Sequence, residues 1–575
     1  MAASRAAVPE LPRWRARLVL FGVGAAFVVL AGRALWLQTL NEDFLQRKGE
    51  SRYARKLEIG ASRGMIVDRH NQPLAISTPV ESVAATPADV DAPPPDLRRL
   101  AELLGLSPEE LREKLSDKRR EHVYLKRQLP PDQAERVVQL GIPGVRLERE
   151  HRRYYPAGEV MAHIIGFTNI DNKGQEAIEL SYEERLAGRP GSRRVIRDRF
   201  GRVVEDIESI GVPQNGEKLT LSIDSRIQYL AFRELRDGVA THRARAGGIV
   251  VLDAQNGEVL AMANLPTYNP NNRGKLDAQR TRNRAITDLF EPGSTLKPFT
   301  AAAALEAGLF QSGTVIQTAP GRMTIGAHTI NDVHPQGALT VAQVIQKSSN
   351  VGTAKMGLAM SSEALWSLFN RAGFGTPPGS GFPGEVSGRL RPHASWRPIE
   401  QATMSYGYGI SVSLLQLARA YTIFSTDGLM FPVSLLRRES PAQGVPVISA
   451  QTARAVRQML EMAAQPGGTA PGAQVAGYTV AGKTGTARKL EGKGYSTSRY
   501  VSSFVGFAPA SQPRIIIAVM IDEPSAGQHY GGAVAAPVFS QVAAGALRLL
   551  AVPPDAPGRT TMLAPADLPL IKEDV

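Results

Sequence analysis

The chain has 575 residues, which is too many for one hydrophobic core, so we expect two or three folded units. With 43% hydrophobic and 21% charged residues it has the composition of a folded protein, and its formal net charge of +13 at pH 7 suits an anionic surface or polymer. No nucleic-acid-binding motif occurs. Because there is no cysteine, disulfides, thiolate zinc sites and a cysteine nucleophile are excluded.

An apolar segment near the N-terminus predicts a membrane anchor. Four arginines in the first 17 residues precede "LVLFGVGAAFVVLAG", residues 18–32, which carries no charge. As a helix this segment spans only about 22 Å, and continuing to residue 40 gives enough length for a hydrocarbon layer of about 30 Å. Trp36 then lies at interface depth, and Arg33 can snorkel or pair with another helix.

The arginines upstream of this segment place the N-terminus in the cytoplasm. A cleaved signal peptide is the alternative, but no convincing small-x-small cleavage site follows the apolar run. We therefore expect a cytoplasmic tail at 1–17, a retained single-pass anchor at 18–40, and the rest of the chain outside the cytoplasm.

The region that follows, 41–220, contains no residues spaced as in a catalytic motif. Residues 66–77, "IVDRHNQPLAIS", predict a hairpin that turns at 70–72. Residues 93–115 predict two helices, with Ser107 as the N-cap of the second. We interpret the region as a non-catalytic spacer or interaction module.

A second unit is expected at 221–552. "SRIQYLAFRELRDGV" has helical spacing, and residues 247–264 predict a hairpin with an Asn256–Gly257 turn. Three more strands are expected in "YTVAGKTGTA", "SSFVGFAPA" and "PRIIIAVMIDEP", with a mostly helical stretch before them. Strands from both ends of a unit that enclose helices predict an α+β fold with an antiparallel sheet flanked by helices. Residues 553–575 are Pro-rich and predict a loose tail.

Three short motifs in this second unit carry the predicted chemistry. Ser294 and Lys297 form the one Ser-x-x-Lys pattern, "KSSN" supplies Ser348 and Asn350, and "AGKTGTA" supplies Lys483-Thr484-Gly485-Thr486. Each pattern alone is weak, but in this order within one unit they match the trio of β-lactamases and penicillin-binding proteins.

The residue types fit acyl transfer. Helical spacing places Lys297 beside the hydroxyl of Ser294, and a neutral lysine can take the hydroxyl proton. Lys297 is neutral only if burial and a cationic neighbour lower its pKa, and Lys483 is such a neighbour. Ser348 can relay a proton to the leaving group, and Asn350 can bind a substrate amide.

The strand that bears the third motif adds to this set. Gly485 lets the strand come close to a bound peptide, and the backbone N–H groups of Ser294 and Thr486 are oxyanion donors. No histidine lies in a competing serine motif. Pro298 is awkward, because it lacks the N–H that would bond to the Ser294 carbonyl in an α-helix.

Longer segments extend this match along nearly the whole chain. They are "SRGMIVDRHNQPLA", "RRYYPAGEVMAHIIGFTNIDNKGQEAIE", "LPTYNPNN", "FEPGSTLKP", "KSSNVG", "YGYGISVS", "AGKTGTA" and "YGGAVAAPVF". With them the chain resembles the class B penicillin-binding proteins, which cross-link peptidoglycan, and most of all the division-type members. Ala177 departs from the pattern, since the family usually has glycine there.

The resemblance implies a membrane anchor, an elongated pedestal of the dimerisation type, and a transpeptidase domain with a five-stranded antiparallel sheet. It implies that Ser294 is acylated by the penultimate D-alanine of a stem peptide, with Lys297 as the base and Ser348 as the relay. Asn350 and Thr484 would contact substrate, and Lys483 and Thr486 would hold its terminal carboxylate. β-Lactams would acylate the same serine. For Tyr406 and Tyr408, packing of the site wall and a direct substrate role both remain open.

The resemblance implies no cofactor and no metal, and it places the chain in the bacterial inner membrane at the division septum, with the catalytic domain in the periplasm. Its implied partners are a membrane glycosyltransferase of the SEDS type and other divisome proteins. Three alternatives stay open: an elongation-type class B enzyme, a β-lactamase or β-lactam sensor, and a non-catalytic divisome scaffold. "YGYG" and the absence of cysteine favour division, and no water-activating base for a β-lactamase is identified.

Overall fold

The computed structural model describes residues 13–36, 54–197, 203–274, 276–492, 494–556 and 558. The chain forms two compact units that interleave in sequence. The first unit takes Met1–Ala61, Pro79–Glu150 and Arg189–Asn215, and the second takes Ser62–Thr78, His151–Gly188 and Gly216–Val575. Most of the expected N-terminal and C-terminal tails, and residues 37–40 of the expected anchor, lie outside the described residues.

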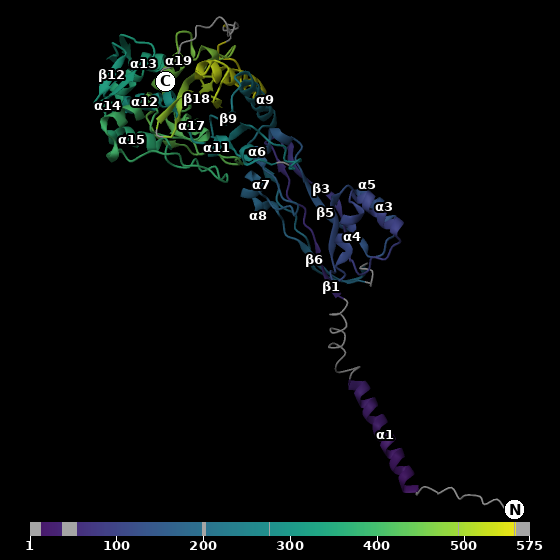
Figure 1. Ribbon diagram of the computed structural model, residues 1–575. Coiled ribbons are helices and arrows are strands. Elements are labelled where there is room, and N and C mark those ends of the chain that lie inside the picture. Colours follow the sequence, from purple (N-terminus) through teal and green to yellow (C-terminus); the bar gives the residue numbers. More distant parts are fainter. Residues whose placement is uncertain are drawn as a thin grey trace, which may run out of the picture. The chain divides into compact units, whose positions relative to one another are not determined.

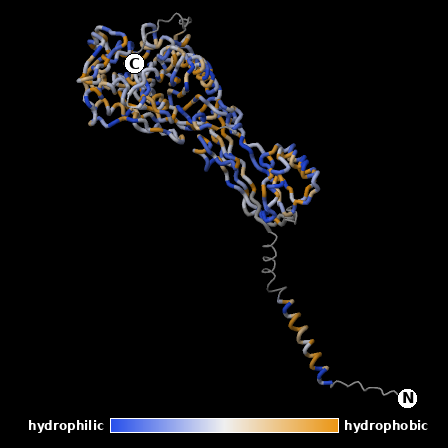
Figure 2. Tube along the Cα trace, in the orientation of Figure 1, coloured by the Kyte–Doolittle hydropathy of each residue, from blue (hydrophilic) through white to orange (hydrophobic). Residues whose placement is uncertain are grey.

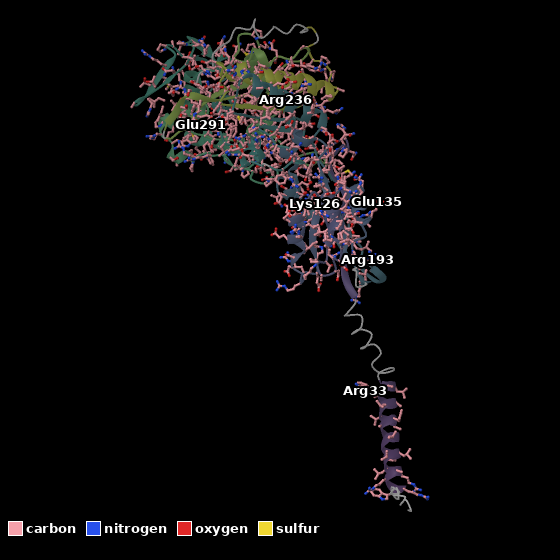
Figure 3. The ribbon with its side chains drawn as sticks, turned by 45° about the vertical axis from the view of Figure 1, so that its right-hand side comes forward. Arg33, Lys126, Glu135, Arg193, Arg236 and Glu291 are labelled. Carbon is pink, nitrogen blue, oxygen red and sulfur yellow. The ribbon has the colours of Figure 1, made fainter. Side chains whose placement is uncertain are left out.

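The first helix, α1 (Arg13–Leu35), is long and apolar enough to cross a membrane. Its 23 residues give a length of about 34 Å, above the roughly 30 Å of a hydrocarbon layer. Figure 2 shows the helix as apolar along most of its length, and Figure 3 marks Arg33. The Arg33 guanidinium lies 4.2 Å from the centroid of the Trp36 ring. The helix starts before residue 18, where the uncharged run begins, and is consistent with a single membrane span.

The first unit combines short helices with antiparallel strands (Figure 1). One sheet has the order β1-β6-β7, and β3 pairs with β4 in addition. A core of buried side chains, among them Leu100, Leu111, Leu125 and Val137, lies beneath the helices. The predicted cap is confirmed, because the Ser107 hydroxyl accepts from the Glu110 N–H at 3.1 Å within a capping box. The bounds are β1 (Ala54–Ile59), β3 (Pro73–Ala85), α3 (Pro94–Leu104), α4 (Pro108–Ser116), β4 (Val123–Leu129), α5 (Pro131–Val138), β5 (Val145–Tyr154), β6 (Gly191–Arg197) and β7 (Val203–Gly211).

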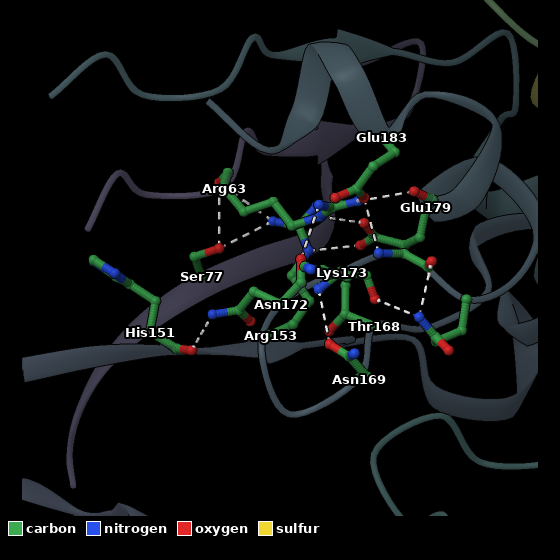
Figure 4. A network of polar contacts seen from close by, with 12 residues as sticks. Arg63, Ser77, His151, Arg153, Thr168, Asn169, Asn172, Lys173, Glu179 and Glu183 are labelled. Atoms are coloured by element: carbon green, nitrogen blue, oxygen red, sulfur yellow. Dashed lines mark hydrogen bonds and ion pairs between the residues drawn. The ribbon is translucent and has the colours of Figure 1, made fainter. Parts of the chain in front are cut away.

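A buried ion network holds together the N-terminal segments of the second unit (Figure 4). Glu179, fully buried, accepts from Arg63 Nε and from Arg153 Nε, both at 2.6 Å. Arg63 also pairs with Glu183 at 2.7 Å. Because each buried charge has a partner, the network ties together chain segments that are far apart in sequence. The bounds are β2 (Ile66–Val67), η2 (Gly158–Val160), α6 (Ala162–Ile165), α7 (Ala177–Ser181), α8 (Glu183–Leu186) and β8 (Leu219–Thr220).

A five-stranded antiparallel sheet forms the centre of the second unit, as the sequence predicts. Its order is β10-β9-β19-β18-β17, so strands from the two ends of the unit meet in the middle of the sheet. The predicted hairpin turn is confirmed, with Gly257 at φ +74°. The bounds are β9 (Ala246–Asp253), β10 (Val259–Leu265), β17 (Ala481–Glu491), β18 (Gly494–Ala508) and β19 (Ile515–Asp522).

Both faces of this sheet are covered by helices (Figure 1). Successive residues of a strand point to opposite faces, so Ile249 and Val251 share one core with α9 and α21, whereas Val250 and Leu252 share the other with α12 and α17. Burial on both faces explains why β9 and β19 read as continuous apolar runs. The helices named here are α9 (Ser225–Thr241), α12 (Lys297–Glu306), α17 (Leu414–Ala420) and α21 (Ala536–Leu549).

The mostly helical stretch between the strand groups also contains short hairpins. The remaining elements are α10 (Ala278–Thr281), α11 (Arg284–Thr287), η3 (Gly293–Leu296), β11 (Val315–Gln317), β12 (Arg322–Ile325), β13 (His328–Asn331), β14 (Ala338–Thr340), α13 (Val341–Lys347), α14 (Asn350–Ala359), α15 (Ser362–Arg371), η4 (His393–Ser395), α16 (Pro398–Ser405), α18 (Thr422–Ser425), β15 (Leu429–Met430), β16 (Val445–Pro446), α19 (Ala450–Ala464), η5 (Pro471–Ala473) and α20 (Gly531–Val534).

Candidate active site

Ser294 lies in a short 3-10 turn, η3, that leads directly into α12. The sequence predicted one continuous helix across Ser294 and Lys297, but the α-helix begins at Lys297. In η3 the Lys297 N–H donates to the Ser294 carbonyl, so that carbonyl has a donor although Pro298 has none to offer. Pro298 then occupies the first turn of α12, where a missing N–H costs little.

Lys297 is fully buried, and its amine contacts the second motif. Nζ lies 3.2 Å from the Ser348 hydroxyl and also donates to the Ser348 carbonyl. Ser348 has a left-handed backbone at φ +62° because it ends α13, and this conformation turns both of its oxygens to the lysine. A strained backbone of this kind is common at functional sites.

The rest of the second motif is fixed by Asp332, a buried residue that the sequence analysis missed. Its carboxylate accepts from the Ser349 hydroxyl at 2.6 Å and from the Val351 N–H at 2.8 Å, at the start of α14. The Asn350 amide donates to the Asn331 carbonyl at 3.2 Å. Asp332 follows β13 in a loop without a motif, so no sequence signal marked it.

The third motif lies on β17, an edge strand of the sheet, directly beside η3. A Cβ atom on Gly485 would lie 2.5 Å from the Ser503 hydroxyl and 2.8 Å from the Pro292 carbonyl. Glycine at this position therefore allows β17 to pack against the turn that carries Ser294. The Thr486 hydroxyl accepts from the Gly531 N–H at 3.0 Å, which fixes α20 against the same strand.

Lys483 is fully buried beside two threonine hydroxyls. Its Nζ lies 3.0 Å from Thr484 Oγ1 and 3.4 Å from Thr469 Oγ1, and the two hydroxyl oxygens are 2.8 Å apart. Thr469 was also missed by the sequence analysis. The Gly467–Gly468 pair before it predicts a turn, but nothing in the sequence links this turn to Lys483.

The "YGYG" segment packs against the nucleophile turn. The Gly293 N–H donates to the Gly407 carbonyl at 3.1 Å, and a Cβ on Gly407 would lie 2.0 Å from the Gly293 carbonyl oxygen. The Tyr406 and Tyr408 rings meet edge to face at 5.9 Å. Burial raises the pKa of Tyr408 to about 12, so its hydroxyl stays protonated at neutral pH.

Glu291 links this aromatic segment to the start of β18 (labelled in Figure 3). One carboxylate oxygen accepts from the Gly409 N–H at 2.7 Å and from the Tyr495 hydroxyl at 3.1 Å. Burial raises the pKa of Glu291, and these two donors partly offset the rise. Glu291 thereby braces the chain three residues before Ser294.

The structure brings all three motifs to one place. Lys297 joins the first motif to Ser348 of the second, and β17, the edge strand that carries Lys483, packs against η3, which carries Ser294. This set can deprotonate an alcohol, carry a proton and attract a carboxylate. The residues described contain no cluster of histidine, aspartate and glutamate suited to a metal ion.

Two family descriptions match the chain. The penicillin-binding protein transpeptidase domain matches residues 247–544, and the penicillin-binding protein dimerisation domain matches residues 58–221. The first match spans the sheet and the three motifs, and the second covers the region without catalytic spacing.

Curated relatives align over nearly the full length. The probable peptidoglycan D,D-transpeptidase PenA of Neisseria gonorrhoeae is 44% identical over 553 residues, which is 96% of this chain and 95% of the relative. The peptidoglycan D,D-transpeptidase FtsI of Escherichia coli K12 is 43% identical over 549 residues, 94% of this chain and 93% of the relative.

Solved structures agree with these matches. The apo transpeptidase domain of Burkholderia pseudomallei penicillin-binding protein 3 is 47% identical with a TM-score of 0.55, and the match covers 58% of this chain and 97% of that one. A peptidoglycan synthetase from Bifidobacterium adolescentis is 25% identical with a TM-score of 0.71, over 88% of this chain and 99% of that one. The chain therefore belongs to the class B penicillin-binding proteins, with a dimerisation domain ahead of a transpeptidase domain.

Proposed function

We propose that this chain is a serine D,D-transpeptidase that cross-links peptidoglycan stem peptides at the division septum. The observation that carries the proposal is the contact of the buried Lys297 amine with Ser348, next to the turn of Ser294 and the strand of Lys483. The relatives named D,D-transpeptidases align with this chain over nearly its full length, and this similarity supports the same reaction here.

In the first half of the reaction, Ser294 is acylated. Neutral Lys297 takes the hydroxyl proton as Oγ bonds to the carbonyl carbon of the penultimate D-alanine. The C–N bond to the terminal D-alanine then breaks. Ser348 gives its hydroxyl proton to the leaving nitrogen and receives in return the proton that Lys297 took, so Lys297 is neutral again. The N–H groups of Ser294 and Thr486 stabilise the oxyanion.

In the second half, the amino group of another stem peptide attacks the ester. A new C–N bond forms, the C–O bond to Ser294 breaks, and the amine's proton returns through Lys297 to the serine oxygen. Before acylation, Lys483, Thr484 and Thr486 hold the terminal carboxylate of the donor peptide, and Asn350 binds its amide. β17 is an edge strand, so an extended peptide can pair beside it.

β-Lactams follow the first half only. Ser294 opens the strained ring by breaking its C–N bond, and the amide nitrogen stays attached to the acyl group. Because this leaving group stays in the site, it obstructs the incoming amine, and the acyl-enzyme persists. The chain is therefore a β-lactam target.

We place this reaction at the membrane because of the N-terminal helix and the region that follows it. α1 anchors the chain in the inner membrane, with the basic N-terminus in the cytoplasm and the catalytic domain in the periplasm. Residues 41–220 form a pedestal that docks on a SEDS-type glycosyltransferase and other divisome proteins, and 221–552 form the catalytic domain. The match of residues 58–221 to a dimerisation domain supports an interaction role.

Covalent labelling with a fluorescent penicillin tests the reaction. The wild-type protein and an exposed-serine control, Ser395→Ala, should be labelled equally, whereas Ser294→Ala should not be labelled. Labelling that survives Ser294→Ala would remove the assignment. Rapid recovery of free enzyme with accumulation of hydrolysed drug would identify a β-lactamase instead.

Two further measurements test the placement. A fluorescent fusion should collect at mid-cell, and a uniform side-wall distribution would favour the elongation-type alternative. Deletion of residues 79–150, which belong to the first unit, should abolish co-purification with the glycosyltransferase, and undiminished co-purification would refute the docking role.

A further inference from the structure

Thr469 is a buried residue that the reaction described above does not use, although it is hydrogen-bonded to Lys483 and Thr484, which the reaction does use. It follows α19 in a turn whose Ala470 N–H donates to the Ala463 carbonyl at 2.9 Å. A Cβ on Gly532 would lie 2.3 Å from the Thr469 carbonyl oxygen, so α20 holds this turn closely in place. Thr469, Lys483 and Thr484 are all at most 2% exposed.

The hydrogens of this group can be counted. An ammonium group only donates, so both threonine oxygens accept from Lys483 at 3.0 and 3.4 Å. The 2.8 Å contact between the two hydroxyls uses one of their two hydrogens. Among the residues that the structure describes, the side-chain bonds of Thr469 and Thr484 run only to each other and to Lys483. One hydroxyl hydrogen is therefore left to donate elsewhere.

The direction of the hydrogen bond between Thr469 and Thr484 decides which of the two hydroxyls keeps a hydrogen to donate elsewhere. If Thr469 donates to Thr484, the Thr484 oxygen accepts twice, from Lys483 and from Thr469, and both of its lone pairs are used. Its own hydrogen then points away from the pair, and the two accepted bonds polarise it into a stronger donor. A carboxylate beside Thr484 selects this direction, because an anion needs a donor.

We infer that Thr469 is a positioning residue for the terminal carboxylate of the stem peptide: it donates to Thr484 and so directs the Thr484 hydrogen to the substrate. The inference rests on the proposed function, in which Thr484 contacts that carboxylate. Thr469 acts through Thr484 and Lys483 and does not itself touch the substrate.

The test compares a fluorescent penicillin with its methyl ester, which lacks the negative charge, on the full-length protein. The readout is the ratio of the two acylation rates. In Thr469→Val the rate with the carboxylate form should fall about tenfold, the size expected for one hydrogen bond to a charged group, while the rate with the ester changes less than twofold. Thr469→Ser keeps the hydroxyl and should restore the ratio.

A matched control separates this effect from general loss of a buried hydroxyl. Thr318 is also fully buried and donates to the Gly337 carbonyl at 2.8 Å, so Thr318→Val should leave the ratio unchanged. If the ratio is unchanged in Thr469→Val, because both rates stay the same or both fall together, the inference is overturned but the proposed function is not. Absence of acylation in the wild type overturns the proposed function and the inference with it.

Discussion

At the scale of single residues, the proposed function gives the two buried lysines different tasks. It requires Lys297 to become neutral and accept a proton, and Lys483 to stay a fixed positive charge. Both are fully buried, and their contacts set them apart: Lys297 faces Ser348, and Lys483 faces Thr469 and Thr484. Substitution by arginine distinguishes the tasks, because a guanidinium keeps its charge but does not deprotonate in proteins.

Lys297→Arg should therefore abolish acylation, with a fall of at least about a thousandfold in the rate of penicillin labelling, the scale of a lost general base. Lys218→Arg, an exposed control, should label like the wild type. If Lys297→Arg retained more than a tenth of the rate, Lys297 would not be the base.

A second residue-scale prediction concerns Asp224, the N-cap of α9. Burial raises its pKa, but hydrogen bonds from Arg226 and His70 outweigh burial and lower the pKa to about 2. A lowered carboxyl pKa stabilises the fold above the unfolded pKa near 4, and this stabilisation disappears as pH falls from about 4 to about 2.

Asp224→Asn keeps a good capping side chain but does not titrate. We expect it to lower the free energy of unfolding by about 2 kcal/mol at pH 7, and the difference from wild type should shrink below pH 4. Denaturant unfolding at several pH values measures this. A difference that stays constant down to pH 2 would mean that the Asp224 charge does not contribute.

At the scale of elements, the start of α14 holds the second motif in position. Asp332 accepts from the Ser349 hydroxyl and the Val351 N–H, so the geometry of Ser348 and Asn350 depends on a residue from another segment. An asparagine can still accept the N–H with its carbonyl oxygen, but its amide nitrogen cannot accept from a hydroxyl.

Asp332→Asn should slow penicillin acylation about fivefold and lower stability by about 1 kcal/mol, the usual value of one hydrogen bond. Rates come from fluorescent labelling and stability from thermal unfolding. Asp237→Asn, an exposed control on α9, should change neither. Normal labelling in Asp332→Asn would show that the Ser349 bond does not position the motif.

The same elements show where sequence reasoning succeeds. The hairpin at Gly257, the cap at Ser107 and the five strands were predictable because each has a local signal: a turn pair, a capping residue or an apolar run. The roles of the three motifs stay predictions, although Lys297 contacts Ser348 and β17 packs against η3. Asp332 and Thr469 were not predictable, because their roles come from tertiary contacts across loops that have no pattern of their own. The 3-10 turn at Ser294 was not predicted. The sequence showed only that Pro298 cannot donate to the Ser294 carbonyl, as an α-helix would require.

At the scale of the whole molecule, each unit draws its residues from separate stretches of the chain. The network of Arg63, Arg153 and Glu179 joins two of these stretches within the second unit. Removing one partner of a buried ion group leaves charges without compensation and typically costs about 3–5 kcal/mol.

Glu179→Gln should therefore destabilise the second unit by about that amount, lower its melting temperature by several degrees and reduce the yield of folded protein. Glu184→Gln, an exposed neighbour on α8, is the matched control and should melt like the wild type. Equal melting temperatures for Glu179→Gln and the control would show that the network adds no stability.

The order of strands in the central sheet has a consequence for the life of the protein in the cell. β19 lies between β9 and β18, and Lys483 arrives on β17, long after Ser294 and Lys297 in the order of synthesis. On the proposed function, a chain that ends before residue 481 has the nucleophile but lacks the strand that completes the site. Such a truncated chain should react neither with wall peptides nor with β-lactams.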